Sequence, residues 1–233
     1  MENSKFKKFA LYGNIVFGIL ILAATIVFKQ TTITKYITKT TASTLFVLCG
    51  LYNFILLYCF NKTKGWWKSL FLLIGLVFAC LGDIVLIDYF TYGAILFAIG
   101  HVFFFVYFIL LHKFNWVDAV ALGGLLTFAL LLIFLYPNFN FGSMRPLVVA
   151  YAVIISIMLA KAIGNYALNV NTPNLICMLG AFFFFFSDLM LLFEVFTSYQ
   201  PIFDYLCIYT YYPAEFLLAL SLLIQKDKYV ERK

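Results

Sequence analysis

Residues 91–111 read TYGAILFAIGHVFFFVYFILL, an unbroken run of 21 residues in which His101 is the only acidic or basic side chain. A helix needs about 20 such residues to cross the hydrocarbon core of a bilayer, which is about 30 Å thick. Barrel strands alternate apolar and polar residues, whereas this run is apolar on every side. The run therefore predicts a transmembrane helix.

Seven further runs of the same kind predict an all-α, polytopic membrane protein with eight transmembrane helices. The spans are expected near residues 9–28, 42–60, 69–87, 91–111, 117–135, 146–163, 174–193 and 205–224. Hydrophobic residues make up 65% of the 233 residues and charged residues only 11%, against about 25% in an average soluble protein. This composition excludes a soluble globule, a disordered chain and a disulfide-stapled secreted fold. We expect residues 1–233 to form a single integral membrane domain.

The first run follows three lysines but ends without a small-residue cleavage site, so we expect a retained span and not a signal peptide. The polar stretch KQTTITKYITKTT (29–41) is expected to form the longest connection. With the N-terminus inside, twelve Lys and Arg residues lie on the inner side and four on the outer side. This bias predicts that both termini are cytoplasmic. The net charge of +6 therefore reports orientation, and no nucleic-acid partner is expected.

Two segments repeat each other along the chain. GLVFACLGDIVLI (75–87) and GAFFFFFSDLMLL (180–192) align without a gap at an offset of 105 residues. Each begins with Gly, has a small residue before an Asp, and continues with aliphatic residues. Because their spans are four helices apart, they cross the membrane in the same direction. The pair is consistent with a parallel repeat of four plus four helices.

Acidic residues within the spans are the candidates for function. A charge at mid-membrane costs at least about 2.5–3.5 kcal/mol, so such a group tends to face an interior cavity. At about 1.5 Å per residue, the ionisable groups fall in one layer in the outer half of the membrane. The members of this layer are Asp83, Asp188, His101 and Glu215, with Tyr151 and Tyr211 beside them. Arg145 is expected above the layer, at the interface, where a lipid phosphate could bind.

Each candidate also has a purely structural interpretation. The two Asp side chains could be neutral carboxyls that hold helices together, and His101 a hydrogen-bonded structural group. Arg145 could be a simple interfacial anchor.

Several chemistries lack their motifs. The chain has no GxSxG, HExxH, P-loop or GxGxxG sequence, and no His or Cys spacing that fits a metal. Its cysteines all lie in apolar runs without a CxxC pair, so buried free thiols are expected. They are Cys49, Cys59, Cys80, Cys177 and Cys207.

LVFACLGDIVL (76–86) followed by FTYGAILFAIGHVFFFVYF (90–108) resembles the paired helices of the YhhN-like lysoplasmalogenases. MRPLVVAYAVIISIML, GAFFFFFSDLMLL and YTYYPAEFLLALSLL resemble the family's later elements in order, so the resemblance covers residues 68–224. It implies an eight-helix membrane hydrolase of the vinyl ether bond, a lysophospholipid substrate, and Asp83 and Asp188 as active-site acids. Glu215 departs from the family, which usually has Gln or another neutral polar residue there.

This chemistry suits two carboxyls. Vinyl ether hydrolysis begins with proton transfer to carbon, which gives an oxocarbenium ion that water attacks. A carboxyl in apolar surroundings stays protonated and donates, while an ionised carboxylate stabilises the cation and activates water. Asp188 follows five Phe residues and is expected to be the acid, and Asp83 the carboxylate that orients water. No metal or organic cofactor is required.

The resulting hypothesis is one cavity that opens sideways to lipid. Asp83 and Asp188 should lie close together in it, with His101, Arg145, Tyr151, Tyr211 and Glu215 binding the substrate. The residues leave two alternatives open: a proton-coupled transporter or lipid-handling protein that uses the same carboxyls, and a purely structural membrane protein. They do not indicate an oligomeric state.

Overall fold

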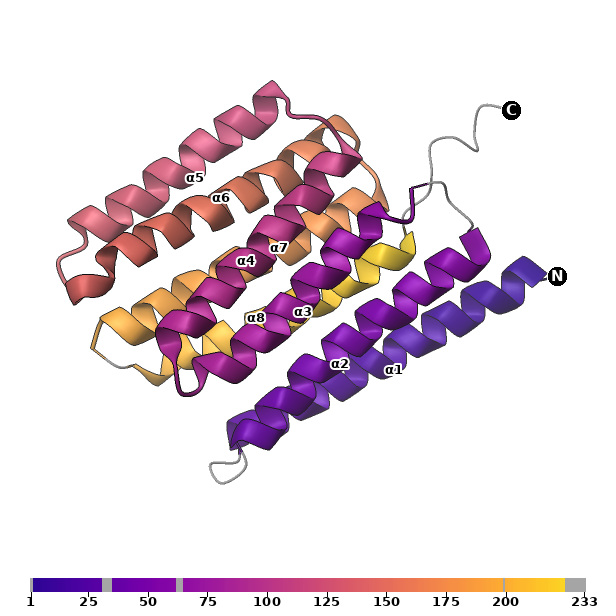
Figure 1. Cartoon of the computed structure of the whole chain (residues 1–233), viewed down its shortest axis with the longest axis horizontal. Coiled ribbons are helices and arrows are strands. Elements are labelled where there is room, and N and C mark those ends of the chain that lie inside the picture. Colours follow the sequence, from indigo (N-terminus) through magenta and orange to yellow (C-terminus); the bar gives the residue numbers. More distant parts are fainter. Residues whose placement is uncertain (1, 31–34, 62–64, 199, 225–233) are drawn as a thin grey trace.

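The computed structural model in Figure 1 is a bundle of long helices, and every regular element within the described residues is helical. These residues are 2–30, 35–61, 65–198 and 200–224. Eight helices are long and apolar enough to cross a membrane, which confirms the predicted architecture of an integral, multi-pass membrane protein. They are α1 (Glu2–Gln30), α2 (Lys35–Leu56), α3 (Lys68–Leu86), α4 (Phe90–Leu111), α5 (Trp116–Leu135), α6 (Arg145–Leu168), α7 (Thr172–Phe196) and α8 (Pro201–Ile224). Two short turns, η1 (Leu57–Asn61) and η2 (Gly142–Met144), follow α2 and precede α6.

Helix α2 begins well before the predicted start of its span. The hydroxyls of Thr41 and Thr44 each donate to the backbone carbonyl four residues earlier, so their polar groups are satisfied within the helix. The prediction that 29–41 forms the longest connection is therefore wrong, although residues 31–34 of that stretch lie outside the described residues. Residues 136–144, between α5 and α6, form a longer connection. Lys39, predicted as a loop charge, consequently lies inside a membrane-spanning helix.

Six helices form a closed ring. Helix α2 packs on α3, α3 on α4, α4 on α6, α6 on α7, α7 on α8, and α8 on α2. Helix α1 lies outside this ring against α2 and α8, and α5 lies outside it against α6. In Figure 1, α1 and α5 accordingly occupy opposite margins of the bundle.

The packing repeats after four helices. The pairs α1–α2, α2–α3 and α3–α4 correspond to α5–α6, α6–α7 and α7–α8, and the pair α4–α6 corresponds to α8–α2. The close approaches repeat as well. A Cβ atom added to Gly75 would overlap Phe104 of α4, and one added to Gly180 would lie 3.0 Å from Leu218 of α8. The contacts thus support the four-plus-four repeat expected from the two Asp segments.

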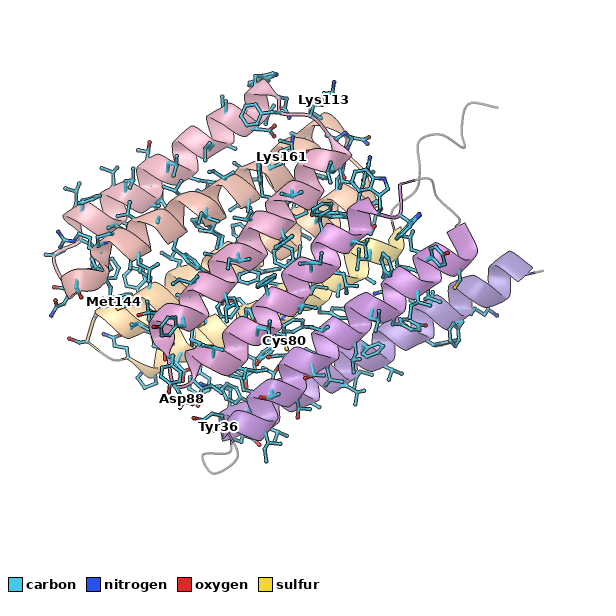
Figure 2. All side chains as sticks on the ribbon, in the orientation of Figure 1. Tyr36, Cys80, Asp88, Lys113, Met144 and Lys161 are labelled. Carbon is cyan, nitrogen blue, oxygen red and sulfur yellow. The ribbon has the colours of Figure 1, made fainter. Side chains whose placement is uncertain are left out.

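The two ends of the bundle differ in how α4 and α6 meet. We call them the Asp88 end, where Tyr36, Asp88 and Met144 lie, and the Lys113 end, where Lys113 and Lys161 lie (Figure 2). At the Lys113 end, Asn165 of α6 donates to the carbonyl of Phe108 in α4 at 2.8 Å. The two helices converge there and lie apart at the Asp88 end (Figure 1).

The cysteines are free thiols, but they are not all buried. Cys49, Cys177 and Cys207 are buried, Cys80 is half-buried and Cys59 is exposed. The prediction is therefore confirmed for three and wrong for Cys59, which lies in the turn η1 on the outside of the bundle.

A buried ion pair joins α5 to α6, and removing one partner tests this packing. Lys161 Nζ donates to Asp118 Oδ2 at 2.8 Å and to the Lys113 carbonyl at 2.9 Å, and both side chains of the pair are 1% exposed. We expect Lys161→Met to lower the free energy of unfolding by about 3–5 kcal/mol, because it leaves a buried charge without a partner. The measurement is unfolding in mixed micelles.

The control is the double variant Lys161→Met with Asp118→Asn. It should regain most of the lost stability, because an amide needs no counter-charge. Equal losses in the single and double variants would contradict the role of this pair.

Candidate functional site

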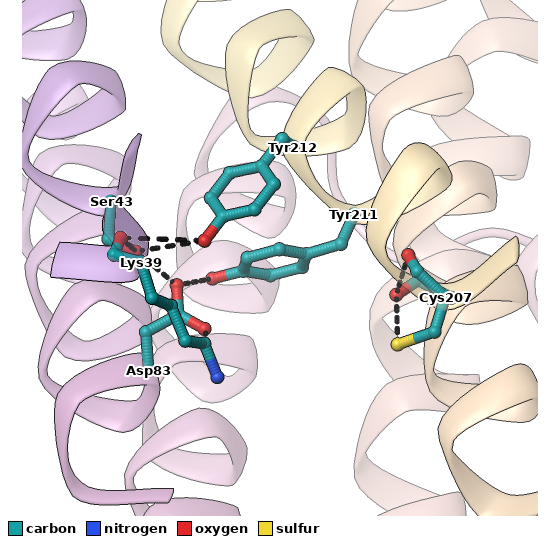
Figure 3. Close-up of polar contacts among 7 residues, drawn as sticks. Lys39, Ser43, Asp83, Cys207, Tyr211 and Tyr212 are labelled. Atoms are coloured by element: carbon teal, nitrogen blue, oxygen red, sulfur yellow. Dashed lines mark hydrogen bonds and ion pairs between the residues drawn. The ribbon is translucent and has the colours of Figure 1, made fainter. Parts of the chain in front are cut away.

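The first polar cluster surrounds Asp83, near the Asp88 end of α3. Its Oδ2 atom accepts hydrogen bonds from Ser43 Oγ at 2.6 Å and from the Tyr211 hydroxyl at 2.7 Å. Lys39 Nζ lies 3.3 Å from the other oxygen, Oδ1 (Figure 3). The Tyr212 hydroxyl lies 3.5 Å from Ser43 Oγ. We call these residues the Asp83 cluster. The cluster is closed, because Asp83 is only 2% exposed and its ammonium partner is a lysine of the protein itself.

The second polar cluster surrounds Asp188 of α7. Its Oδ2 atom accepts a hydrogen bond from the Tyr151 hydroxyl at 2.7 Å and lies 3.1 Å from His101 Nε2. The other ring nitrogen, His101 Nδ1, is buried and has no partner among the described residues. We call these three residues the Asp188 cluster.

The two clusters occupy equivalent places in the repeat. Asp83 is the sixteenth residue of α3 and Asp188 the seventeenth of α7, while Tyr211 is the eleventh of α8 and His101 the twelfth of α4. Each carboxyl takes one donor from the preceding helix of its own half and one from the last helix of the other half. The sequence indicated the paired Asp residues together with Tyr211, Tyr151 and His101, but not Ser43.

Aromatic rings stand between the clusters. The ring of Tyr211 meets Phe97 and Phe184 edge to face, with centroids 5.8 Å and 5.3 Å away. Phe184 in turn meets the ring of His101 at 4.5 Å. Helix α3 packs against α2, α4 and α8, whereas α7 packs against α6 and α8. Ring contacts through Tyr211, Phe184 and His101 thus lead from one carboxyl to the other.

A cavity of about 90 Å³ adjoins only the Asp188 cluster. Its walls come from α4, α5, α6 and α7, with Leu86 of α3, and its only polar side chains are those of Tyr151 and Asp188. Asp83, His101, Tyr211 and Glu215 are not among its lining residues. Of the residues expected to line one cavity, Asp188 and Tyr151 line this chamber. What the cavity offers is a carboxyl and a hydroxyl in an apolar chamber.

Arg145 and Glu215 are not lining residues of this chamber. Arg145 is the exposed first residue of α6, with its guanidinium 5.8 Å from the ring of Phe141. Leu147 and Val148, which follow it closely, line the cavity. Arg145 therefore lies toward the Asp88 end of the chamber. Glu215 is fully buried in α8, and neither of its oxygens has a hydrogen-bond partner among the described residues.

Two functional candidates were missed by the sequence analysis. Lys39 and Ser43 lie four residues apart on one face of α2, and both contact Asp83. Their spacing was a usable signal, but the surrounding threonines suggested a loop. Within the described ranges, no three His, Cys, Asp or Glu side chains gather in a way that would hold a metal ion.

These features define a class: a polytopic membrane protein with paired carboxyl clusters inside a helical ring. A sequence model of the YhhN family matches residues 54–222, and the chain belongs to that family. The chain is also similar to a protein of Bos taurus named lysoplasmalogenase TMEM86A, with 32% identity over 166 residues. That alignment covers 64% of this chain and 63% of the relative, less than two thirds of either. No solved structure matches the chain.

Removing one tyrosine hydroxyl from each cluster should have unequal effects on stability. Tyr211→Phe takes a donor from the enclosed, Lys39-paired Asp83, and we expect a loss of about 1.5–3 kcal/mol. Tyr151→Phe should cost less than about 1 kcal/mol, because the Asp188 side chain is 13% exposed and therefore less fully enclosed than that of Asp83.

Thermal or chemical unfolding of both variants in the same detergent measures the difference. A larger loss for Tyr151→Phe would contradict the distinction between a closed and an open cluster.

Proposed function

We propose that this protein is a membrane hydrolase that cleaves the vinyl ether bond of lysoplasmalogens to a fatty aldehyde and a glycerophospho-alcohol. The observation that carries the proposal is the Asp188 carboxyl in the wall of an otherwise apolar chamber. Membership of the YhhN family and the name of the bovine relative support the same activity. In this proposal residues 1–233 act as one membrane domain, with both termini in the cytoplasm.

In this proposal the substrate is a phospholipid with one hydrocarbon chain. Arg145 would bind its phosphate, and the chamber would hold its chain. Arg145 is a cation for the phosphate at the Asp88 end. Tyr151 lies six residues farther along α6, or about 9 Å at the rise of a helix. A lysolipid with its phosphate near Arg145 would therefore place its ether group near Tyr151 and Asp188. Its hydrocarbon chain would contact the leucine and phenylalanine side chains that line the chamber.

The reaction begins at Asp188. Its protonated carboxyl donates to the outer carbon of the C=C bond, and the positive charge then spreads over the adjoining carbon and oxygen. The carboxylate that remains stabilises this oxocarbenium ion by charge. Water adds to the cationic carbon and loses a proton, which restores the acid. The hemiacetal then collapses to the alcohol and the aldehyde.

Tyr151 and His101 would hold Asp188 in position for this step. Both lie within hydrogen-bond distance of Oδ2, so Oδ1 remains the oxygen that can carry the transferred proton. The apolar walls favour the protonated carboxyl before the reaction.

We propose a positioning role for Asp83, in place of direct contact with water at the reacting atoms. It binds the hydroxyl of Tyr211, whose ring packs against Phe97, a residue of the chamber wall. Asp83→Asn should then retain part of the activity, because an amide oxygen still accepts from Tyr211.

One observation favours a second candidate, proton-coupled transport. Glu215 is a fully buried carboxyl without a hydrogen-bond partner among the described residues, and intramembrane carboxyls of this kind serve proton relays. Lipid uptake by proteoliposomes that depends on a proton gradient, with the lipid recovered intact, would favour this candidate over hydrolysis.

The central prediction concerns Asp188→Asn. We expect the variant to release aldehyde from an alkenyl lysophospholipid about 10²–10⁴-fold more slowly than the wild type, because the proton donor is lost. Asp88→Asn is the matched control, since it makes the same change near the surface and should keep full activity. A coupled aldehyde assay in detergent measures both. Wild-type protein that releases no aldehyde across several head groups would overturn the proposal.

The chamber itself gives another prediction. Ala152 of α6 lines it, whereas Ala150 of the same helix is exposed and is not a lining residue. Ala152→Phe should fill the chamber and raise KM at least about tenfold, because the loss of a few buried CH₂ contacts at about 0.8 kcal/mol each exceeds 1.4 kcal/mol. Ala150→Phe should leave KM unchanged. Equal effects of the two variants would place the substrate elsewhere.

A further inference from the structure

In both clusters, one oxygen of the Asp carboxylate has the same kind of hydrogen-bond surroundings. In each, one carboxylate oxygen is surrounded by two donors from neighbouring helices. Asp83 Oδ2 has Ser43 and Tyr211, and Asp188 Oδ2 has Tyr151 and His101. The two clusters can be compared directly, because both Asp residues occupy equivalent places in the four-plus-four repeat.

The other oxygen distinguishes them. Asp83 Oδ1 faces the ammonium of Lys39 at 3.3 Å, so a primary ammonium on a four-carbon chain fills that side of the carboxylate. No described residue donates a hydrogen bond to Asp188 Oδ1, and Asp188 lines the apolar chamber. Where the Asp83 carboxyl has a lysine ammonium beside it, the Asp188 carboxyl therefore has a chamber lined by hydrocarbon.

We propose that the chamber beside Asp188 binds single-chain lipids with a primary amine head, and that the ammonium takes the position against Asp188 that Lys39 takes against Asp83. The carboxylate supplies the charge-assisted contact, and the chamber walls supply the apolar surface for the chain. Lys39 is the internal precedent, because its side chain is itself an alkylammonium bound to the equivalent carboxylate.

The same position is where positive charge develops in the proposed reaction. An alkylamine that receives the Asp188 proton forms a carboxylate–cation pair like the one that follows protonation of the vinyl ether. Such amines should therefore compete with the lysophospholipid, and this consequence rests on the proposed function. Binding of the amine itself does not depend on hydrolysis.

Dodecylamine is the probe and 1-dodecanol its control, because the two share the chain and differ in the charged head. We expect calorimetry in nanodiscs to give at least about tenfold tighter binding of the amine to wild-type protein, as a hydrogen bond to a charged group predicts. Asp188→Asn should abolish this preference. Asp88→Asn should keep it, and it corrects for amine that partitions into the lipid.

A second variant tests whether Asp83 binds an added alkylammonium once Lys39 has been removed. Lys39→Ala removes the built-in ammonium and leaves Asp83 without its cation. Propylammonium should then raise the thermal unfolding temperature of Lys39→Ala, but not that of the wild type or of Lys39→Ala with Asp83→Asn. If Lys39→Ala does not fold, the Asp188 comparison still decides the proposal.

The outcomes separate this proposal from the proposed function. Equal binding of amine and alcohol, or a preference that survives Asp188→Asn, overturns the amine site even if aldehyde is released. Selective amine binding without aldehyde release supports the site and overturns the hydrolase.

Discussion

A carboxyl inside a hydrocarbon layer has no water to accept from, so its donors must come from other helices of the protein. This constraint organises the whole bundle. Asp83 joins α3 to α2 and α8, and Asp188 joins α7 to α4 and α6. Together these are the six helices of the ring, and the two helices outside it contribute to neither cluster. The closed ring and the two buried carboxyls are thus one structural feature.

The sequence contained enough to predict the helices but not their partners. Long apolar runs fix the spans, because few other structures bury so much hydrocarbon. The polar start of α2 was missed, since Ser and Thr hydroxyls bond back to their own helix and so remain compatible with a span. Lys39 was assigned to the surface for the same reason. Only a partner on another helix, Asp83, explains its burial, and that partner lies 44 residues away in the sequence.

The two candidate acids were found by repetition, yet their difference was not. The segments around Asp83 and Asp188 have the same pattern, which predicts the same depth and direction but says nothing of what faces the second oxygen. In the structure Asp83 Oδ1 faces a lysine, whereas the Asp188 side chain lines a chamber. In the first half of the repeat, Lys39 neutralises the Asp83 carboxylate, and this ion pair favours stability. In the second half, the Asp188 carboxyl lines the chamber.

The position of the chamber follows from how α6 is held. At the Lys113 end, α6 is fixed by directional bonds from Lys161 and Asn165. At the Asp88 end its surroundings are an apolar cluster that includes Phe139, Phe141 and Phe196. Contacts between such rings are less directional than hydrogen bonds, and a hydrocarbon chain can replace them at little cost. The chamber thus lies where apolar contacts, and not the hydrogen bonds of Lys161 and Asn165, surround α6.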